Sequence, residues 1–177
     1  MKTVLITGSN RGLGLEFAKC YSENNYNVIA CCRNKDVASD LHSLSKKHDS
    51  IQMYSLDVSD TVQIKALSNS LQSQPIDILI NNAGIYRPST LGDIDKDDWM
   101  DSFLVNTIAP YEIIQNFLPN LLIGESKKVV SITSKMGSID DNTSGGSYIY
   151  RSSKTALNSM MRSLSHDLLS QGISTLT

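Results

Sequence analysis

The chain has 177 residues, of which 40% are hydrophobic and 19% are charged, and its formal net charge is -2. This length favours a single domain over residues 1–177, and the composition is that of an ordinary globular protein rather than a disordered, fibrous or membrane chain. A slightly acidic chain with only short basic runs gives no support for a nucleic-acid partner.

The three cysteines, Cys20, Cys31 and Cys32, do not form a recognisable framework. Their odd number and the adjacent pair suit neither a set of disulfides nor a zinc site, so we expect no metal and a reducing compartment. The first apolar run, Val4 to Ile6, is too short for a signal peptide or a membrane span. We therefore predict a cytoplasmic protein without a membrane partner.

Short apolar runs alternate with longer amphipathic stretches, which predicts βαβ units around a parallel sheet buried on both faces. The expected strands are residues 2–7, 26–32, 51–56, 76–81, 127–133 and 173–177. The expected inner faces of three helices are formed by Leu13, Phe17 and Cys20, by Val62, Ile64, Leu67 and Leu71, and by Ile108, Ile113, Ile114, Phe117 and Leu118. Right-handed crossovers then give a doubly wound, three-layer α/β/α fold.

A glycine-rich turn follows the first strand and opens a helix, as in a dinucleotide phosphate loop; a flexible turn is the plain alternative. Gly8 permits the tight turn, Gly12 lets the backbone approach a pyrophosphate, and Gly14 allows close helix packing. The helix N-terminus supplies oriented N–H groups and partial positive charge. The cofactor contacts expected here are Gly8, Ser9, Asn10, Arg11, Gly12, Leu13 and Gly14.

Tyr150 and Lys154 have the spacing Y-x-x-x-K, which places a phenol and an ammonium one turn apart on one helix face. A nearby ammonium favours the ionised form of a phenol, so Tyr150 would act as a general acid or base. Tyr148 has Ser152 at that spacing, so we expect it to line the pocket or pack.

These motifs resemble those of the classical short-chain dehydrogenase/reductase family, whose T-G-x-x-x-G-x-G signature matches residues 7–14. Residues 81–84 match its N-N-A-G segment. The resemblance implies a Rossmann fold, adenine-side contacts from Asp57 and Val58, and further cofactor contacts from Asn81, Asn82, Ala83, Gly84, Tyr150 and Lys154. It also implies a catalytic tetrad of Asn106, Ser134, Tyr150 and Lys154, with Ser134 orienting the substrate and Asn106 distorting a helix to hold a relay water.

Each member of this tetrad has a plainer alternative. Tyr150 would serve as a boundary aromatic, Lys154 as a solvated helix residue, Ser134 as a strand-end cap and Asn106 as a helix cap. The presence of all four in the family's order favours the catalytic interpretation.

The second strand ends without the acidic residue that accepts hydrogen bonds from the ribose of NAD. Cys32 occupies the expected acidic position, and Arg33 follows it. A guanidinium can bind a phosphate through paired hydrogen bonds, and Arg11 adds a second cation. We therefore expect NADP(H), although either arginine could instead be a surface residue.

The leading hypothesis is an NADPH-dependent oxidoreductase that reduces a small aldehyde or ketone by hydride transfer. The alternative is a non-catalytic NADP(H)-binding sensor or interaction module. The loop of residues 138–147 resembles that of the C-factor and sniffer-type carbonyl reductases, and could equally be a surface insertion. The resemblance also implies a Pro-Gly turn, a substrate lid and a seventh strand beyond residue 177, so we expect a chain truncated after its sixth strand. The helices after Asn106 and Tyr150 resemble those through which family members pair as homodimers or homotetramers, and an apolar face on these helices could equally be part of the core.

Overall fold

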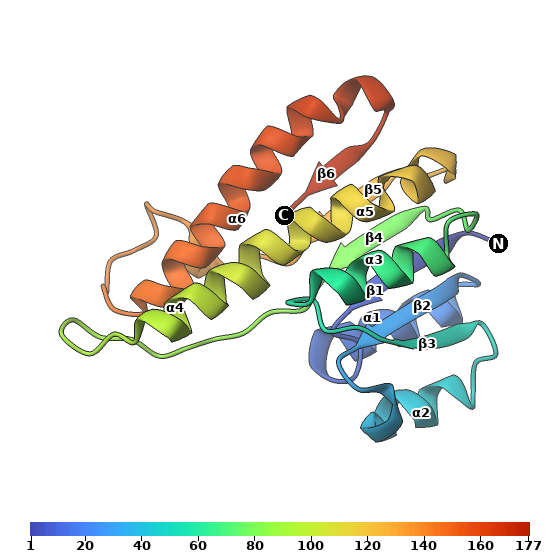
Figure 1. Cartoon of the computed structure of the whole chain (residues 1–177), viewed down its shortest axis with the longest axis horizontal. Helices are drawn as coiled ribbons and strands as arrows, with labels where there is room; N and C mark the ends of the chain where they lie inside the picture. The colour runs from blue at the N-terminus through green and yellow to red at the C-terminus, as the bar shows by residue number, and fades with distance from the viewer.

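The computed structural model describes all 177 residues and contains one parallel sheet of six strands (Figure 1). The strands are β1 (Thr3–Thr7), β2 (Asn27–Cys32), β3 (Ile51–Ser55), β4 (Ile78–Asn81), β5 (Lys128–Ser131) and β6 (Ser174–Leu176). Their spatial order, β3-β2-β1-β4-β5-β6, is that of a Rossmann fold. The predicted doubly wound α/β fold is confirmed, and all six strands lie within the predicted ranges.

Six α-helices connect these strands and cover both faces of the sheet. They are α1 (Gly12–Glu23), α2 (Ser39–Ser45), α3 (Thr61–Ser70), α4 (Lys96–Phe103), α5 (Ala109–Ile123) and α6 (Tyr148–Asp167). A π-helical segment, Leu104–Ile108, joins α4 to α5, and single 3-10 turns occur at Lys35–Val37, Lys135–Gly137 and Leu169–Gln171. No helix has both the length and the apolar character that crossing a membrane requires.

Alternate side chains along the strands pack into two separate hydrophobic cores, one on each face of the sheet. Leu5 and Ile29 pack with α3, α5 and α6 on one face, whereas Val4, Ile6 and Val28 pack with α1 and α2 on the other. Figure 1 shows these two helix layers on opposite sides of the sheet. The near-continuous apolar runs of the strands follow from this, because every second residue enters a different core.

The predicted inner faces of the helices are partly wrong. Leu13 is 62% exposed and Cys20 is also exposed, because the buried stripe of α1 is Gly14, Ala18 and Ser22. At Gly14 an added Cβ would collide with Gly8 O, in the loop after β1, so no larger residue fits at this position. In α3, Val62 is 75% exposed, since it lies about 200° around the helix from buried Ile64.

Ile108 was also predicted to face the core, and this is wrong as well: its side chain is 46% exposed. The π-helical segment ends at this residue, and its wider turn shifts the phase of the side chains that follow. Ala109, Ile113, Ile114 and Phe117 are buried, as an inner face of α5 requires.

Candidate functional site

The glycine-rich loop lies at the carboxyl end of β1 and leads directly into α1. Ser9 fixes it on two sides: its N–H donates to Cys31 O at 2.9 Å, and its hydroxyl donates to Ile6 O at 2.7 Å. No side chain caps the N-terminus of α1, so the N–H groups of its first turn remain available to an anion. A Cβ added to Gly12 would meet no atom within 4 Å, which means that open space lies beside the loop.

The N-N-A-G segment after β4 packs against this loop and is hydrogen-bonded to it. The Asn82 amide donates to Thr7 O at 2.9 Å and to Gly8 O at 3.1 Å. The Thr7 hydroxyl in turn accepts from the N–H groups of Asn82 and Ala83, both at 3.0 Å. A Cβ on Gly14 would collide with Gly8 O. The two segments therefore form one rigid cradle whose backbone suits a pyrophosphate.

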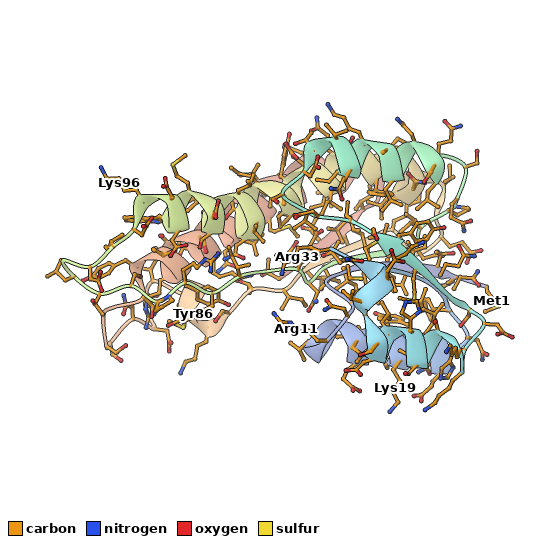
Figure 2. All side chains as sticks on the ribbon, turned by 60° about the horizontal axis from the view of Figure 1, so that its bottom comes forward. Met1, Arg11, Lys19, Arg33, Tyr86 and Lys96 are labelled. Carbon is orange, nitrogen blue, oxygen red and sulfur yellow. The ribbon has the colours of Figure 1, made fainter.

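Arg11 and Arg33 are both exposed, and neither forms an ion pair. Figure 2 shows them in one region of the molecule, at the carboxyl ends of β1 and β2. This follows from the contact between Ser9 and Cys31, which brings the glycine-rich loop against the end of β2. Asn10 and Leu13 of the same loop are also exposed, so the exposed side chains of residues 8–14 include one cation, Arg11, and no carboxylate.

The other predicted cofactor contacts lie around this edge. Asp57 follows β3, and its Oδ1 accepts from the N–H and hydroxyl of Ser59 at 3.0 and 2.6 Å; Val58 is buried. Asn81 is buried between β4, β5 and α5, and its amide donates to Pro110 O and Ser131 Oγ, both at 3.4 Å. Its side chain thus faces the interior.

Tyr150 and Lys154 lie in the first two turns of α6, as their spacing predicts. Lys154 is only 5% exposed, its Nζ donates to Ile132 O at 2.8 Å, and it lies 5.9 Å from the centre of the Tyr150 ring. Burial lowers the pKa of Lys154 to about 8. Lys154 is therefore not a solvated helix residue, and its Nζ is buried near the Tyr150 ring.

Asn106 lies in the π-helical segment and is fully buried, so it is not a helix cap. Its Oδ1 accepts from Ile85 N–H at 2.8 Å, and its Nδ2 donates to Ile85 O at 2.9 Å and to Ser153 Oγ at 3.0 Å. The widened turn thereby connects the segment after β4 to the helix of Tyr150. Gly84 shows how tight this junction is, because an added Cβ would lie 3.2 Å from Asn106 Oδ1 and 3.6 Å from Lys154 Nζ.

Ser134 follows β5 and begins a 3-10 turn, where its hydroxyl oxygen accepts from Met136 N–H at 3.1 Å. The hydroxyl hydrogen remains free to donate. Gly137 ends the turn against α6, since an added Cβ would lie 3.1 Å from the Cβ of Lys154. The close approach of this turn to the helix brings Ser134 to the same end of the sheet as the Tyr150–Lys154 pair.

Several residues that the sequence analysis did not single out hold these segments together. Thr155 Oγ1 donates to Gly137 O at 2.9 Å, and Thr133 Oγ1 donates to Asn158 Oδ1 at 2.6 Å. Both helix residues follow Lys154 on α6. A hydroxyl and an amide at such positions are common on helix surfaces, so the sequence carried no signal for their role.

Tyr86 was also missed. Its ring meets that of Tyr150 edge to face, with 5.1 Å between the centroids, and its hydroxyl shares a hydrogen bond of 3.2 Å with Ser147 Oγ. The loop of residues 138–147 is therefore attached to the site at its end, and Arg151 Nη2 further ties it to α6 by donating to Ser144 Oγ at 3.2 Å.

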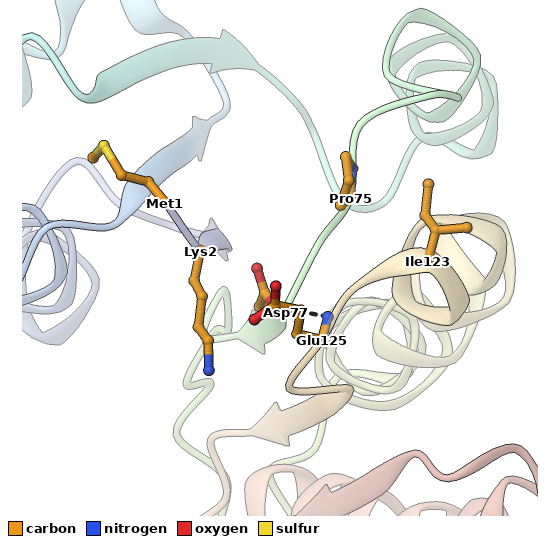
Figure 3. Close-up of a pocket in the computed structure, with 6 residues that line it drawn as sticks. All are labelled: Met1, Lys2, Pro75, Asp77, Ile123 and Glu125. Carbon is orange, nitrogen blue, oxygen red and sulfur yellow. Dashed lines mark hydrogen bonds between the residues drawn. The ribbon is translucent and has the colours of Figure 1, made fainter.

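A hollow of about 290 Å³ lies at the opposite, amino-terminal end of the strands (Figure 3). It is lined by Met1, Lys2, Pro75, Asp77, Ile123 and Glu125. Asp77, the buried member, is already satisfied: its carboxylate accepts from the N–H groups of Thr3, Glu125 and Ser126 at 2.7, 2.8 and 3.1 Å. None of the predicted site residues lies here, so we assign this hollow a structural role.

Comparisons with known proteins identify the family of this chain. The family model described as short chain dehydrogenase matches residues 2–177. The C-signal protein of Myxococcus xanthus is 41% identical over 113 residues, which cover 63% of this chain and 68% of that protein.

Two solved structures are similar over almost the whole chain. The NADPH-bound carbonyl reductase from chicken fatty liver is 33% identical with a TM-score of 0.91, over 99% of this chain and 77% of that one. The carbonyl reductase Sniffer of D. melanogaster is 32% identical with a TM-score of 0.89, over 98% of this chain and 77% of that one. The chain belongs to the short-chain dehydrogenase family, in its carbonyl-reductase-like branch.

Proposed function

We propose that this oxidoreductase uses NADPH to reduce the carbonyl group of an aldehyde or ketone, with Tyr150 as the proton donor. The observation that carries the proposal is the placement of a buried ammonium, Lys154, beside the Tyr150 phenol. This pair lies at the same end of the sheet as an uncapped helix N-terminus and its glycine-rich loop. A phosphate cradle and a proton-transfer pair at one edge fit hydride-transfer chemistry.

In this proposal Ser134 and Tyr150 donate hydrogen bonds to the carbonyl oxygen and so place the carbonyl carbon for attack. Bound NADPH supplies the hydride that this carbon accepts. As negative charge develops on oxygen, Tyr150 Oη gives up its proton to it. The Lys154 ammonium stabilises the phenolate that remains, and Ile132 O holds that ammonium in position.

Asn106 acts one step farther from the substrate. It holds Ile85 through paired hydrogen bonds and Ser153 through a third, so it fixes α6 relative to the segment after β4. We assign the cofactor to the cradle of residues 8–14 and 82–84, with Tyr150 and Lys154 at its nicotinamide end, Asp57 and Val58 near the adenine, and Asn81 supporting the cradle from the interior.

The choice of NADPH over NADH rests on Arg11 and Arg33. Two unpaired guanidinium groups favour a ribose phosphate, and the last residue of β2 is Cys32 rather than the acid that would accept hydrogen bonds from an unphosphorylated ribose. The similar chicken liver enzyme has NADPH bound. Cys32, which replaces the acid, is buried, and burial raises the pKa of its thiol, so it stays neutral beside the phosphate.

Titration of the purified protein with NADPH and with NADH tests this assignment. We expect tighter binding of NADPH, and Arg11→Ser and Arg33→Ser each to weaken NADPH by about tenfold while changing NADH little. Arg162→Ser is the matched control, because Arg162 is an exposed arginine on the part of α6 beyond Lys154. Equal affinities for the two nucleotides would contradict the roles of both arginines.

A further inference from the structure

Tyr86 lies against the proposed proton donor, yet it does not enter the chemistry described above. The two tyrosine rings meet at an interplanar angle of 66°, so the edge of one ring faces the other. The Tyr86 hydroxyl is occupied by Ser147, which lies in a left-handed conformation immediately before α6. Tyr86 therefore bridges the phenol of the site and the end of the loop of residues 138–147.

The position of Tyr86 is fixed by its neighbour in the chain. Both backbone groups of Ile85 are held by the Asn106 side chain, at 2.8 and 2.9 Å. These bonds fix the backbone from which Tyr86 projects, and the hydrogen bond of its hydroxyl to Ser147 holds the ring beside Tyr150. Despite these contacts the Tyr86 side chain remains 55% exposed, so a large part of its surface beside the Tyr150 ring is open to a ligand.

We propose that Tyr86 is a specificity-determining residue that forms one wall of the substrate site and selects carbonyl compounds carrying a flat aromatic group. This inference rests on the proposed function. When a carbonyl oxygen accepts a hydrogen bond from Tyr150 Oη, a substituent on the carbonyl carbon can reach the Tyr86 ring, whose centroid lies 5.1 Å from that of the Tyr150 ring. Two aromatic rings packed edge to face or offset-stacked attract each other by more than their buried area accounts for. A puckered aliphatic ring of similar size lacks this additional attraction.

The test compares two ketones of nearly equal size, acetophenone and cyclohexyl methyl ketone. For each protein we would measure kcat/KM with NADPH, and the dissociation constant of each ketone from the protein saturated with NADP+, in which no hydride is available. Tyr86→Leu should lower the ratio of aromatic to aliphatic kcat/KM, and the corresponding ratio of affinities, by about threefold to tenfold. Tyr86→Phe should preserve both ratios, because it keeps the ring and loses only the hydrogen bond to Ser147.

Tyr111→Leu is the matched control: Tyr111 is an exposed tyrosine on α5, and its replacement should leave both ratios unchanged. If Tyr86 had a purely structural role, Tyr86→Leu would lower kcat/KM and affinity by the same factor for both ketones, and this result would overturn the inference. The affinities separate the two proposals. If no ketone is reduced but the aromatic preference in binding still depends on Tyr86, the proposed reaction fails and the inference about the wall stands.

Discussion

Replacement of Lys154 by methionine should change how the stability of the apo protein depends on pH. Burial lowers the pKa of this ammonium from its usual 10.5 to about 8. At about 1.4 kcal/mol for each pKa unit, keeping the ammonium charged in the folded state costs about 3 kcal/mol. Between these two pH values the unfolded chain holds the proton and the folded chain does not, so stability rises with pH.

The cost is complete below pH 8 and is relieved as the pH rises toward 10.5. Methionine has no proton to lose and nearly the same length. The free energy of unfolding of the wild type, minus that of Lys154→Met, should therefore increase by about 3 kcal/mol between pH 7 and pH 10.5. Urea unfolding followed by circular dichroism at several pH values measures this difference, in which the titration of groups that do not interact with Lys154 cancels. A difference that stays constant over this range would refute a buried, charged Lys154.

Two further substitutions test the packing of the fold. Gly14→Ala should destabilise the protein by about 3 kcal/mol or more and abolish nucleotide binding, because its Cβ meets the carbonyl of Gly8; thermal unfolding and NADPH titration measure both effects. Gly12→Ala, the control for stability, should cost only about 1–2 kcal/mol of backbone strain at φ +55°, since no atom lies nearby; equal losses of stability in the two variants would contradict the close approach at Gly14. Asp77→Asn should cost about 1–3 kcal/mol at pH 7. Burial raises the pKa of Asp77, but hydrogen bonds from three backbone N–H groups outweigh this effect and hold the pKa below 3.8. The difference in denaturant midpoint between wild type and Asp77→Asn should therefore shrink as the pH falls below about 4. A difference independent of pH would argue against an ionised carboxylate.

Strands β1, β2 and β4 could be predicted from the sequence because they are buried on both faces and are therefore short, nearly continuous apolar runs. The helix faces were harder to predict, because two of the errors depend on the path of the backbone. Leu13 faces outward since Gly14 takes the position against Gly8, in the loop after β1, and Ile108 faces outward since the π-helical segment before α5 shifts the phase. Hydrophobic periodicity assumes a regular helix and a generic neighbour, and neither holds at these positions.

In the candidate site, too, features set by local helix spacing could be predicted, and features set by contacts between distant segments could not. Tyr150 and Lys154 are linked by local helix spacing, so the sequence alone was enough to pair them. Their positions relative to Tyr86, Thr133 and Asn158 depend on contacts between segments far apart in the chain, which a spacing rule cannot describe. The burial of Lys154 also depends on contacts with other segments, because Ile132 and the turn at Gly137 create it.

Transfer of deuterium from NADPH labelled at both C4 positions to a ketone, with the alcohol analysed by mass spectrometry, tests the central claim most directly. The wild type should place one deuterium on the carbinol carbon. Tyr150→Phe should bind NADPH with nearly the same affinity and yield at least about a hundredfold less labelled alcohol, since the proton donor is gone. Labelled alcohol formed at the wild-type rate by Tyr150→Phe would contradict the role of Tyr150, and binding of NADPH by a wild type that labels no aldehyde or ketone would point to a nucleotide-binding module instead.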